Sequence, residues 1–147
     1  RVFLAEEDVS DAIRTQDISI AASNVSAVPE VRAFLFDLQR DLAKKNHVVM
    51  DGRDIGTVVL PNAQVKIFLT ASPEERAQRR YLELREKGLE AEYDQVLTEL
   101  KQRDYDDSHR AVAPLVPAED AIMVDSTGLT REQAFQRLLR TVQDKIS

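Results

Sequence analysis

Short, almost wholly apolar runs alternate with helical patterns along this chain, and this alternation limits the fold more than any other feature. The clearest case is the run of residues 65–70, VKIFLT, which is followed at once by Ser72-Pro73-Glu74-Glu75. A serine N-cap, a proline in the first turn and a glutamate three residues after the cap predict a helix from Pro73 to about Glu86. Strands that lack polar alternation and lead directly into helices are typical of a parallel sheet covered on both faces. We therefore predict an α/β fold.

Other segments extend this pattern. Pro29 suits the first turn of a helix, and apolar residues recur at helical spacing from there to about Lys45. The sequence Thr130-Arg131-Glu132-Gln133 repeats the capping signal and predicts a last helix that ends near Asp144. The remaining predictions are strands at residues 1–4, 47–50 and 121–125, one or two short helices within 8–28, and a helical pattern through Val96, Leu97 and Leu100.

Composition excludes several classes of function. The net charge of −6 and the pI of about 5.0 argue against a general nucleic-acid-binding surface, which is normally basic. No apolar run approaches the roughly 20 residues of a membrane-spanning helix. The chain has no cysteine, and His47 and His109 are its only histidines, so we expect no zinc site. These properties fit a cytoplasmic protein, and we expect no nucleic acid and no membrane among its partners.

The first candidate site is the segment Asp51-Gly52-Arg53-Asp54-Ile55-Gly56-Thr57, which follows the predicted strand 47–50. Ligands bind beyond the carboxyl ends of strands in open parallel sheets. Arg53 can donate two hydrogen bonds to a phosphate, and Asp54 can accept from an exocyclic amino group. On spacing alone, a turn with one Arg–Asp surface pair remains an equally open interpretation.

The second candidate site is the run from Arg103 to Arg110. If this run is helical, Arg103, Asp107 and Arg110 lie within about 60° of one another, because successive helical residues turn by about 100°. Two guanidinium groups beside one carboxylate suit a phosphorylated ligand with sugar hydroxyls. A salt-bridged face exposed to solvent produces the same spacing, and this alternative stays open.

Other polar residues carry little information alone. Ser23 and Arg32 are plausible polar contacts in or near helices, and Arg76, Arg79 and Arg80 place positive charge on the helix after Pro73, where a solvated face is the simpler interpretation. No G-x-x-x-x-G-K-S/T motif passes through the four glycines, so the sequence lacks the loop and lysine that hold ATP phosphates in P-loop enzymes.

Several stretches together resemble the bacterial cytidylate kinase family, in order and over nearly the whole chain. The combination of D-G-R-D-I-G-T at 51–57 with R-A-V-A-P-L at 110–115 is the specific part. Supporting stretches are Glu7-Asp8-Val9-Ser10, Ile13-Arg14-Thr15, Ala21-Ala22-Ser23, Val31-Arg32, Arg103-Asp104 and Asp125-Ser126-Thr127.

The resemblance implies a kinase that phosphorylates CMP or dCMP with ATP and Mg²⁺. It implies that Ser23, Arg32 and Asp54 recognise cytosine, that Arg53 and Arg110 bind the monophosphate and act in catalysis, and that Arg103 and Asp107 bind the sugar. It also implies a P-loop kinase fold divided into a monophosphate-binding region at 1–46, a core at 47–78 and 111–147, and a lid at 79–110.

The sequence departs from the family pattern at its N-terminus, where the P-loop of the family has no counterpart. Arg1-Val2-Phe3-Leu4 is typical of a strand already in progress, so we expect the chain to be part of a longer protein whose N-terminal core elements, including the P-loop, lie outside it. We expect the 147 residues alone to be inactive. The alternatives are a non-catalytic nucleotide-binding module and a monophosphate kinase specific for UMP or AMP.

Overall fold

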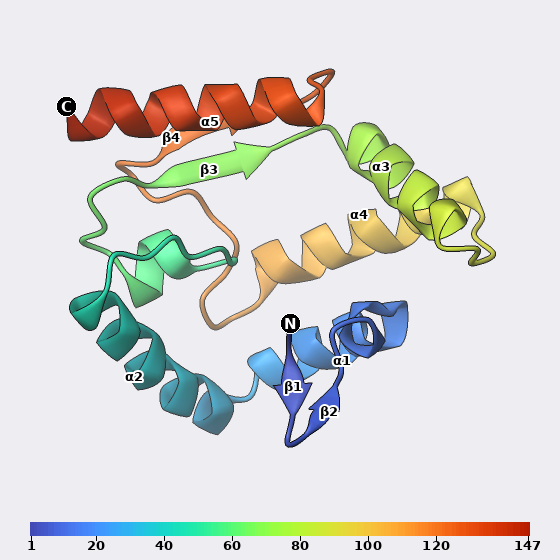
Figure 1. Ribbon diagram of the computed structural model, residues 1–147, viewed down its shortest axis with the longest axis horizontal. Coiled ribbons are helices and arrows are strands. Elements are labelled where there is room, and N and C mark those ends of the chain that lie inside the picture. The colour runs from blue at the N-terminus through green and yellow to red at the C-terminus, as the bar shows by residue number, and fades with distance from the viewer. The chain divides into compact units, whose positions relative to one another are not determined.

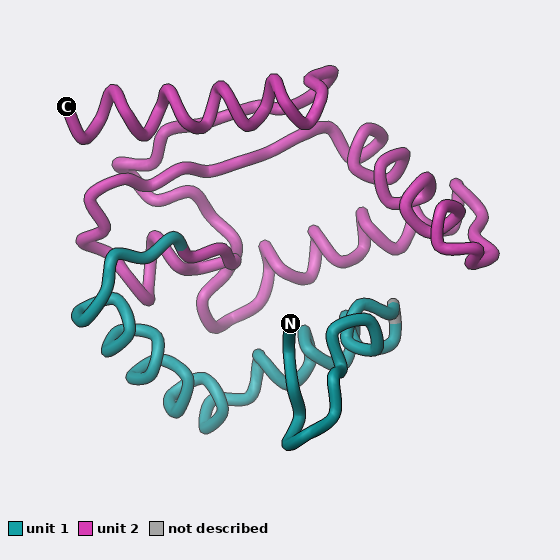
Figure 2. The backbone as a smooth tube through the Cα atoms, viewed as in Figure 1, with its two compact units in different colours: residues 1–49 teal, residues 50–147 magenta. Residues whose placement is uncertain are grey.

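The computed structural model describes residues 1–15 and 17–147 and divides the chain into two compact units, Arg1–Val49 and Met50–Ser147. Figure 2 distinguishes the two units by colour.

The first unit consists of a small hairpin and two main helices. Strand β1 (Phe3–Leu4) pairs with β2 (Glu7–Asp8) in antiparallel register, and Ala5 in the connecting turn has a left-handed backbone with φ of 54°. The prediction of a strand at the start of the chain is thus confirmed over two residues. The helices are η1 (Ala12–Arg14), α1 (Gln16–Ser26) and α2 (Pro29–Lys45), which confirms both the short helices within 8–28 and the long helix from Pro29.

The second unit is built on a parallel pair of strands (Figure 1). Strands β3 (Ile67–Thr70) and β4 (Ile122–Asp125) pair from Ile67 opposite Ile122 to Thr70 opposite Asp125. The helices are η2 (Ile55–Val59), a single turn of π-helix, and α3 (Pro73–Glu86), α4 (Tyr93–His109) and α5 (Arg131–Ile146). A mixed α/β architecture with a small parallel sheet is therefore confirmed.

Local capping sets the two helix starts that the sequence predicted. The Ser72 hydroxyl accepts from the Glu75 amide at 3.2 Å, with Pro73 in the first turn of α3. At α5 the capping box is reciprocal: the Gln133 amide donates to the Thr130 hydroxyl, and the Thr130 amide donates to the Gln133 side chain. These bonds satisfy amide groups that the helix itself leaves without acceptors.

The predicted strand at 47–50 is wrong. These residues form no strand, and Val49 is fully exposed. A strand is stable only when its backbone groups pair with a neighbour, and within the described residues the only parallel pairing is that of β3 with β4. The sheet thus has two parallel strands where the apolar runs predicted more.

The core of the second unit is small, and its buried side chains come from separate elements, with α3 packed against α4 and β4 paired with β3. Its most buried apolar side chains are Val59, Ala71, Ala77, Val96 and Val124. Helices α3 and α4 run antiparallel, since Tyr81 meets Tyr93 edge to face at one end, with ring centroids 6.2 Å apart, and Arg76 meets Asp104 nearer the other. No helix in the described part of the chain is both long and apolar enough to cross a membrane.

Candidate functional site

The most concentrated charge in the second unit surrounds Asp107, near the C-terminal end of α4. Its carboxylate is buried, and three guanidinium groups face it. Arg53 Nε donates to Oδ2 at 2.9 Å, while Arg103 Nε and Arg110 Nη1 lie 3.9 Å from the carboxylate oxygens. We call these four residues the arginine cluster. The predicted common face of Arg103, Asp107 and Arg110 is confirmed, and Arg53 joins it from 54 positions away in the sequence.

The backbone around Arg53 is tightly held. Asp54 is buried, and its carbonyl accepts from the amides of Val58 at 2.8 Å and Val59 at 3.2 Å, which begins the π-helical turn η2. A Cβ added to Gly52 would come within 2.8 Å of the Ile55 side chain. The close approach of the Ile55 side chain to the backbone, rather than an unusual φ, therefore explains why position 52 is a glycine. Turns of π-helix are rare and are frequent at functional sites.

The loop after α4 holds Arg110 in a second constrained segment. Arg110 Nε donates to the Ala113 carbonyl at 2.6 Å, and Ala113 adopts a left-handed backbone with φ of 50°. The Leu115 amide donates to the Asp107 carbonyl at 2.8 Å and so folds the loop back onto the helix. The stretch 110–115 thus fixes the end of α4 and the arginine that follows it.

Sequence reasoning missed a further ion pair beside the cluster. Arg76 Nη1 and Nη2 donate to the two carboxylate oxygens of Asp104 at 3.0 and 2.5 Å, and Arg76 Nε donates to the Ala71 carbonyl at 3.1 Å. The partners lie 28 positions apart, so no local spacing indicates the pair.

Polar groups also gather where β3 and β4 end. The Ser126 hydroxyl donates to the Thr70 carbonyl at 3.0 Å, and Arg79 Nη2 donates to the Ser126 carbonyl at 2.8 Å. The Thr127 hydroxyl and amide donate to Asp125, and these bonds hold the pKa of the Asp125 carboxyl below its usual value. Arg79, expected on a solvated face, thus joins α3 to the end of β4.

A cavity of about 630 Å³ opens beside the arginine cluster within the second unit. One side is formed by the Asp51–Thr57 segment and another by β3. Its charged and polar lining includes Arg53, Arg76, Asp104, Lys66 and Ser108. Guanidinium groups at the edge of a cavity of this size can bind a phosphorylated small molecule.

In the first unit, Ser26 links the two predicted base-contacting residues. The Ser26 hydroxyl donates to the Ser23 carbonyl at 2.8 Å, and Arg32 Nη1 donates to the Ser26 carbonyl at 3.3 Å. Ser23 and Arg32 are both half-buried. The junction of α1 and α2 therefore brings these two residues into one short network.

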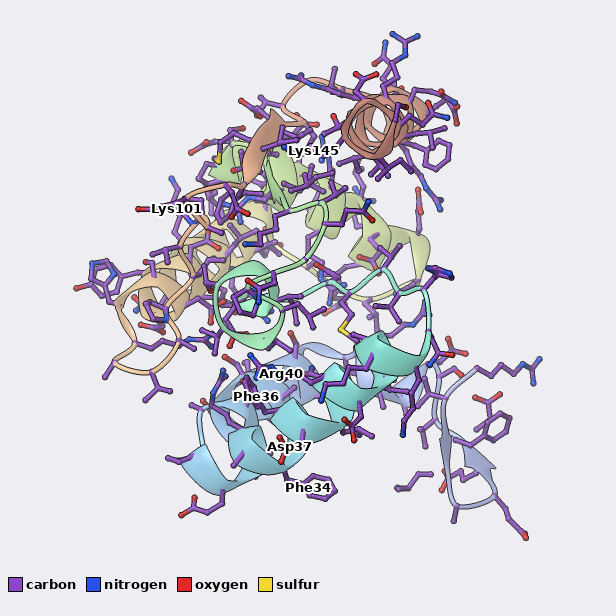
Figure 3. All side chains as sticks on the ribbon, turned by 90° about the vertical axis from the view of Figure 1, so that its left-hand side faces the viewer. Phe34, Phe36, Asp37, Arg40, Lys101 and Lys145 are labelled. Carbon is purple, nitrogen blue, oxygen red and sulfur yellow. The ribbon has the colours of Figure 1, made fainter. Side chains whose placement is uncertain are left out.

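Phe34 is the most exposed aromatic residue of α2, and Figure 3 labels it together with Phe36 and Arg40. The Arg40 guanidinium lies over the Phe36 ring at 4.2 Å from its centroid. None of these side chains was predicted to belong to the site. Among the described residues, no group of three or more His, Cys, Asp or Glu side chains lies close enough together to hold a metal ion.

Comparison with known proteins gives one consistent family. The family model described as cytidylate kinase matches residues 1–144. A protein named cytidylate kinase from Caldicellulosiruptor saccharolyticus is 57% identical over 138 residues, which are 94% of this chain and 61% of that protein. The cytidylate kinase of Pasteurella multocida is 51% identical over 146 residues, 99% of this chain and 64% of its own length. The chain thus spans about three fifths of the length of these curated relatives.

Proposed function

The chain belongs to the cytidylate kinase family, and on this basis we propose that the protein transfers a phosphoryl group from ATP to CMP or dCMP, giving CDP or dCDP. The observation that carries the proposal is the meeting of Arg53 and Arg110 at one buried carboxylate beside a cavity. The phosphates of the acceptor and of the magnesium-ATP co-substrate need such cationic donors. The partners are small nucleotides, and the protein acts as a monomer.

The site residues divide by the chemistry of their groups. Arg53 and Arg110 bind the acceptor monophosphate and spread the charge of the phosphoryl group in transfer. Arg103 and Asp107 bind the sugar hydroxyls. Asp54, Ser23 and Arg32 recognise the cytosine base, because a carboxylate and a hydroxyl accept from the 4-amino group and a guanidinium donates to the ring. Uracil reverses two of these positions and would leave buried groups without partners.

Catalysis in this scheme comes from position and charge, with no covalent intermediate on the protein. Arg53 is held by η2 and Asp107, and Arg110 by Ala113, so both guanidinium groups are oriented before the ligand arrives. Groups fixed in advance lose little entropy on binding and stabilise charge as it develops in transfer. When a phosphate binds, its oxygens replace the Asp107 carboxylate as partners of the arginines.

We further propose the family fold for the protein. This fold is a P-loop nucleoside monophosphate kinase core at 47–78 and 111–147, with a monophosphate-binding region at 1–46 and a lid at 79–110. The boundary between the two compact units falls at 49–50, close to the end of the first of these regions. The helical hairpin of α3 and α4 spans the proposed lid.

Acceptor kinetics test the proposal. The protein expressed from its complete gene should turn over CMP and dCMP with ATP in a coupled ADP-release assay, with UMP and AMP poorer acceptors. Arg53→Met should lower kcat/KM for CMP by about 10²–10³-fold, the range expected for a lost charge-stabilising donor. A preference for UMP or AMP would overturn the base assignment, and a P-loop-containing protein without turnover would favour the non-catalytic module.

The same assay applies to this chain by itself. Its 147 residues contain no P-loop motif, so we expect weak CMP binding and no phosphoryl transfer. Steady turnover above background would contradict this expectation.

A further inference from the structure

We propose that Arg76 and Asp104 are positioning residues, which hold α4 at the end of β3 so that Asp107 and Arg53 meet. The kinetic part of this proposal rests on the proposed function, whereas its structural part does not. Neither residue belongs to the arginine cluster. Both line the neighbouring cavity, and the positioning role rests only on their bonds to each other and to Ala71.

Arg76 connects two separate elements through three hydrogen bonds. Its Nε donates to the carbonyl of Ala71, a buried residue just beyond β3, at 3.1 Å. Its two terminal nitrogens donate to Asp104 on α4 at 3.0 and 2.5 Å. A planar guanidinium that makes a bidentate bond to a carboxylate and a third bond to the main chain fixes direction as well as distance. The pair therefore sets where α4 lies relative to the end of β3.

The position of Asp104 explains why this connection matters to the cluster. Asp104 and Asp107 lie three residues apart on α4, which places them on one side of the helix and roughly 4.5 Å apart along its axis. A shift of α4 at Asp104 therefore moves Asp107 by a similar amount. The bond from Arg53 to Asp107 measures 2.9 Å, and a shift of about 1 Å would take it outside hydrogen-bonding range.

A second ion pair between the same helices provides a matched control. Glu74 on α3 and Lys101 on α4 lie 3.0 Å apart, and both side chains are more than half exposed. Lys101, labelled in Figure 3, lies one turn before Asp104 on α4. Exposed pairs of this kind contribute about 0–1 kcal/mol. If salt bridges between α3 and α4 only add stability, loss of either pair should have similar consequences for the cluster.

The direct test is NMR of the arginine side chains in this chain. The Arg53 Nε–H signal, assigned by its loss in Arg53→Lys, should be separated from those of exposed arginines and should exchange slowly with water. Asp104→Asn should move it toward the exposed arginines and speed its exchange at least tenfold, whereas Glu74→Gln should leave it unchanged. If Asp104→Asn does not fold, Arg76→Lys removes the bidentate bond while keeping the charge and should move the same signal. An unchanged Arg53 signal in the folded variant would overturn the proposal.

Kinetics of the protein from its complete gene supply a second readout. Asp104→Asn should lower kcat/KM for CMP about tenfold without changing KM for ATP, and Glu74→Gln should stay within twofold of wild type. Equal effects of the two variants would contradict a positioning role. An inactive wild-type enzyme would refute the proposed function instead, and the Arg53 signal would then decide the proposal by itself.

Discussion

Replacement of Asp107 by asparagine is the sharpest perturbation that the structure offers. The substitution keeps the shape of the side chain and removes the negative charge that three guanidinium groups share. Coulomb's law at 2.9 Å and an effective dielectric of about 20 gives roughly 6 kcal/mol for the Arg53 pair in isolation. Solvent screens this value, because the Arg53 and Arg103 side chains are 41% and 44% exposed. We expect a loss of about 2 kcal/mol in the free energy of unfolding, below the roughly 3–5 kcal/mol of fully buried pairs.

The same variant should gain more than wild type from an added oxyanion. Without the carboxylate, the three guanidinium groups of the arginine cluster lose the negative charge that they share, so phosphate no longer competes with Asp107 for them. A ligand that binds only the folded state adds RT ln(1 + [L]/Kd) to stability, about 2.7 kcal/mol at one hundred times Kd. Inorganic phosphate in the millimolar range should therefore restore much of the lost stability.

The assay is urea unfolding at neutral pH and constant ionic strength, with phosphate exchanged for chloride. Asp106→Asn is the matched control, because Asp106 is exposed, lies next to Asp107 on α4 and bonds only to Gln102 among the contacts seen. The control should change by less than about 0.5 kcal/mol and should gain no more from phosphate than wild type. The reasoning is refuted if both aspartate variants behave alike, or if phosphate stabilises Asp107→Asn no more than wild type.

Three further predictions concern single residues outside the arginine cluster. Ala113→Gly should be neutral or slightly stabilising in thermal unfolding, whereas Ala113→Val should destabilise by about 1–2 kcal/mol, because φ is 50° there and a β-branched residue resists that region. Gly52→Ala should cost about 1–3 kcal/mol in urea unfolding, since its Cβ would collide with Ile55 at 2.8 Å; unchanged stability would contradict the close approach. The hydrogen bond from Lys66 lowers the pKa of the Asp120 carboxyl below its usual 3.8. The bond therefore stabilises the folded state above pH 3.8, and this stabilisation is lost as the pH falls through the lowered pKa. Asp120→Asn should lose less stability in acid than wild type, and identical pH profiles would count against the bond.

Local sequence signals predicted the helices because their causes are local. Ser72 with Pro73, and Thr130 with Gln133, bond within one turn, so four residues of sequence contain the whole interaction. The common face of Arg103, Asp107 and Arg110 followed from the helical repeat in the same way.

Residue spacing alone could not predict the pairings between distant parts of the chain. The run at 47–50 has the composition of a strand, but composition does not reveal whether a partner strand lies beside it, and in this chain none pairs with it. The bonds from Arg53 to Asp107 and from Arg76 to Asp104 join positions 54 and 28 residues apart. Helical spacing therefore grouped Arg103, Asp107 and Arg110, whereas only the family resemblance implied that Arg53 joins them, and the folded chain shows its bond to Asp107.

The most direct test of the proposed site is a crystal structure of the protein from its complete gene with CMP bound. We expect phosphate oxygens within hydrogen-bonding distance of both Arg53 and Arg110, and the Asp54 carboxylate at the 4-amino group of cytosine. A nucleotide bound elsewhere, with Arg53 still paired to Asp107 and Arg110 turned away from the phosphate, would contradict it.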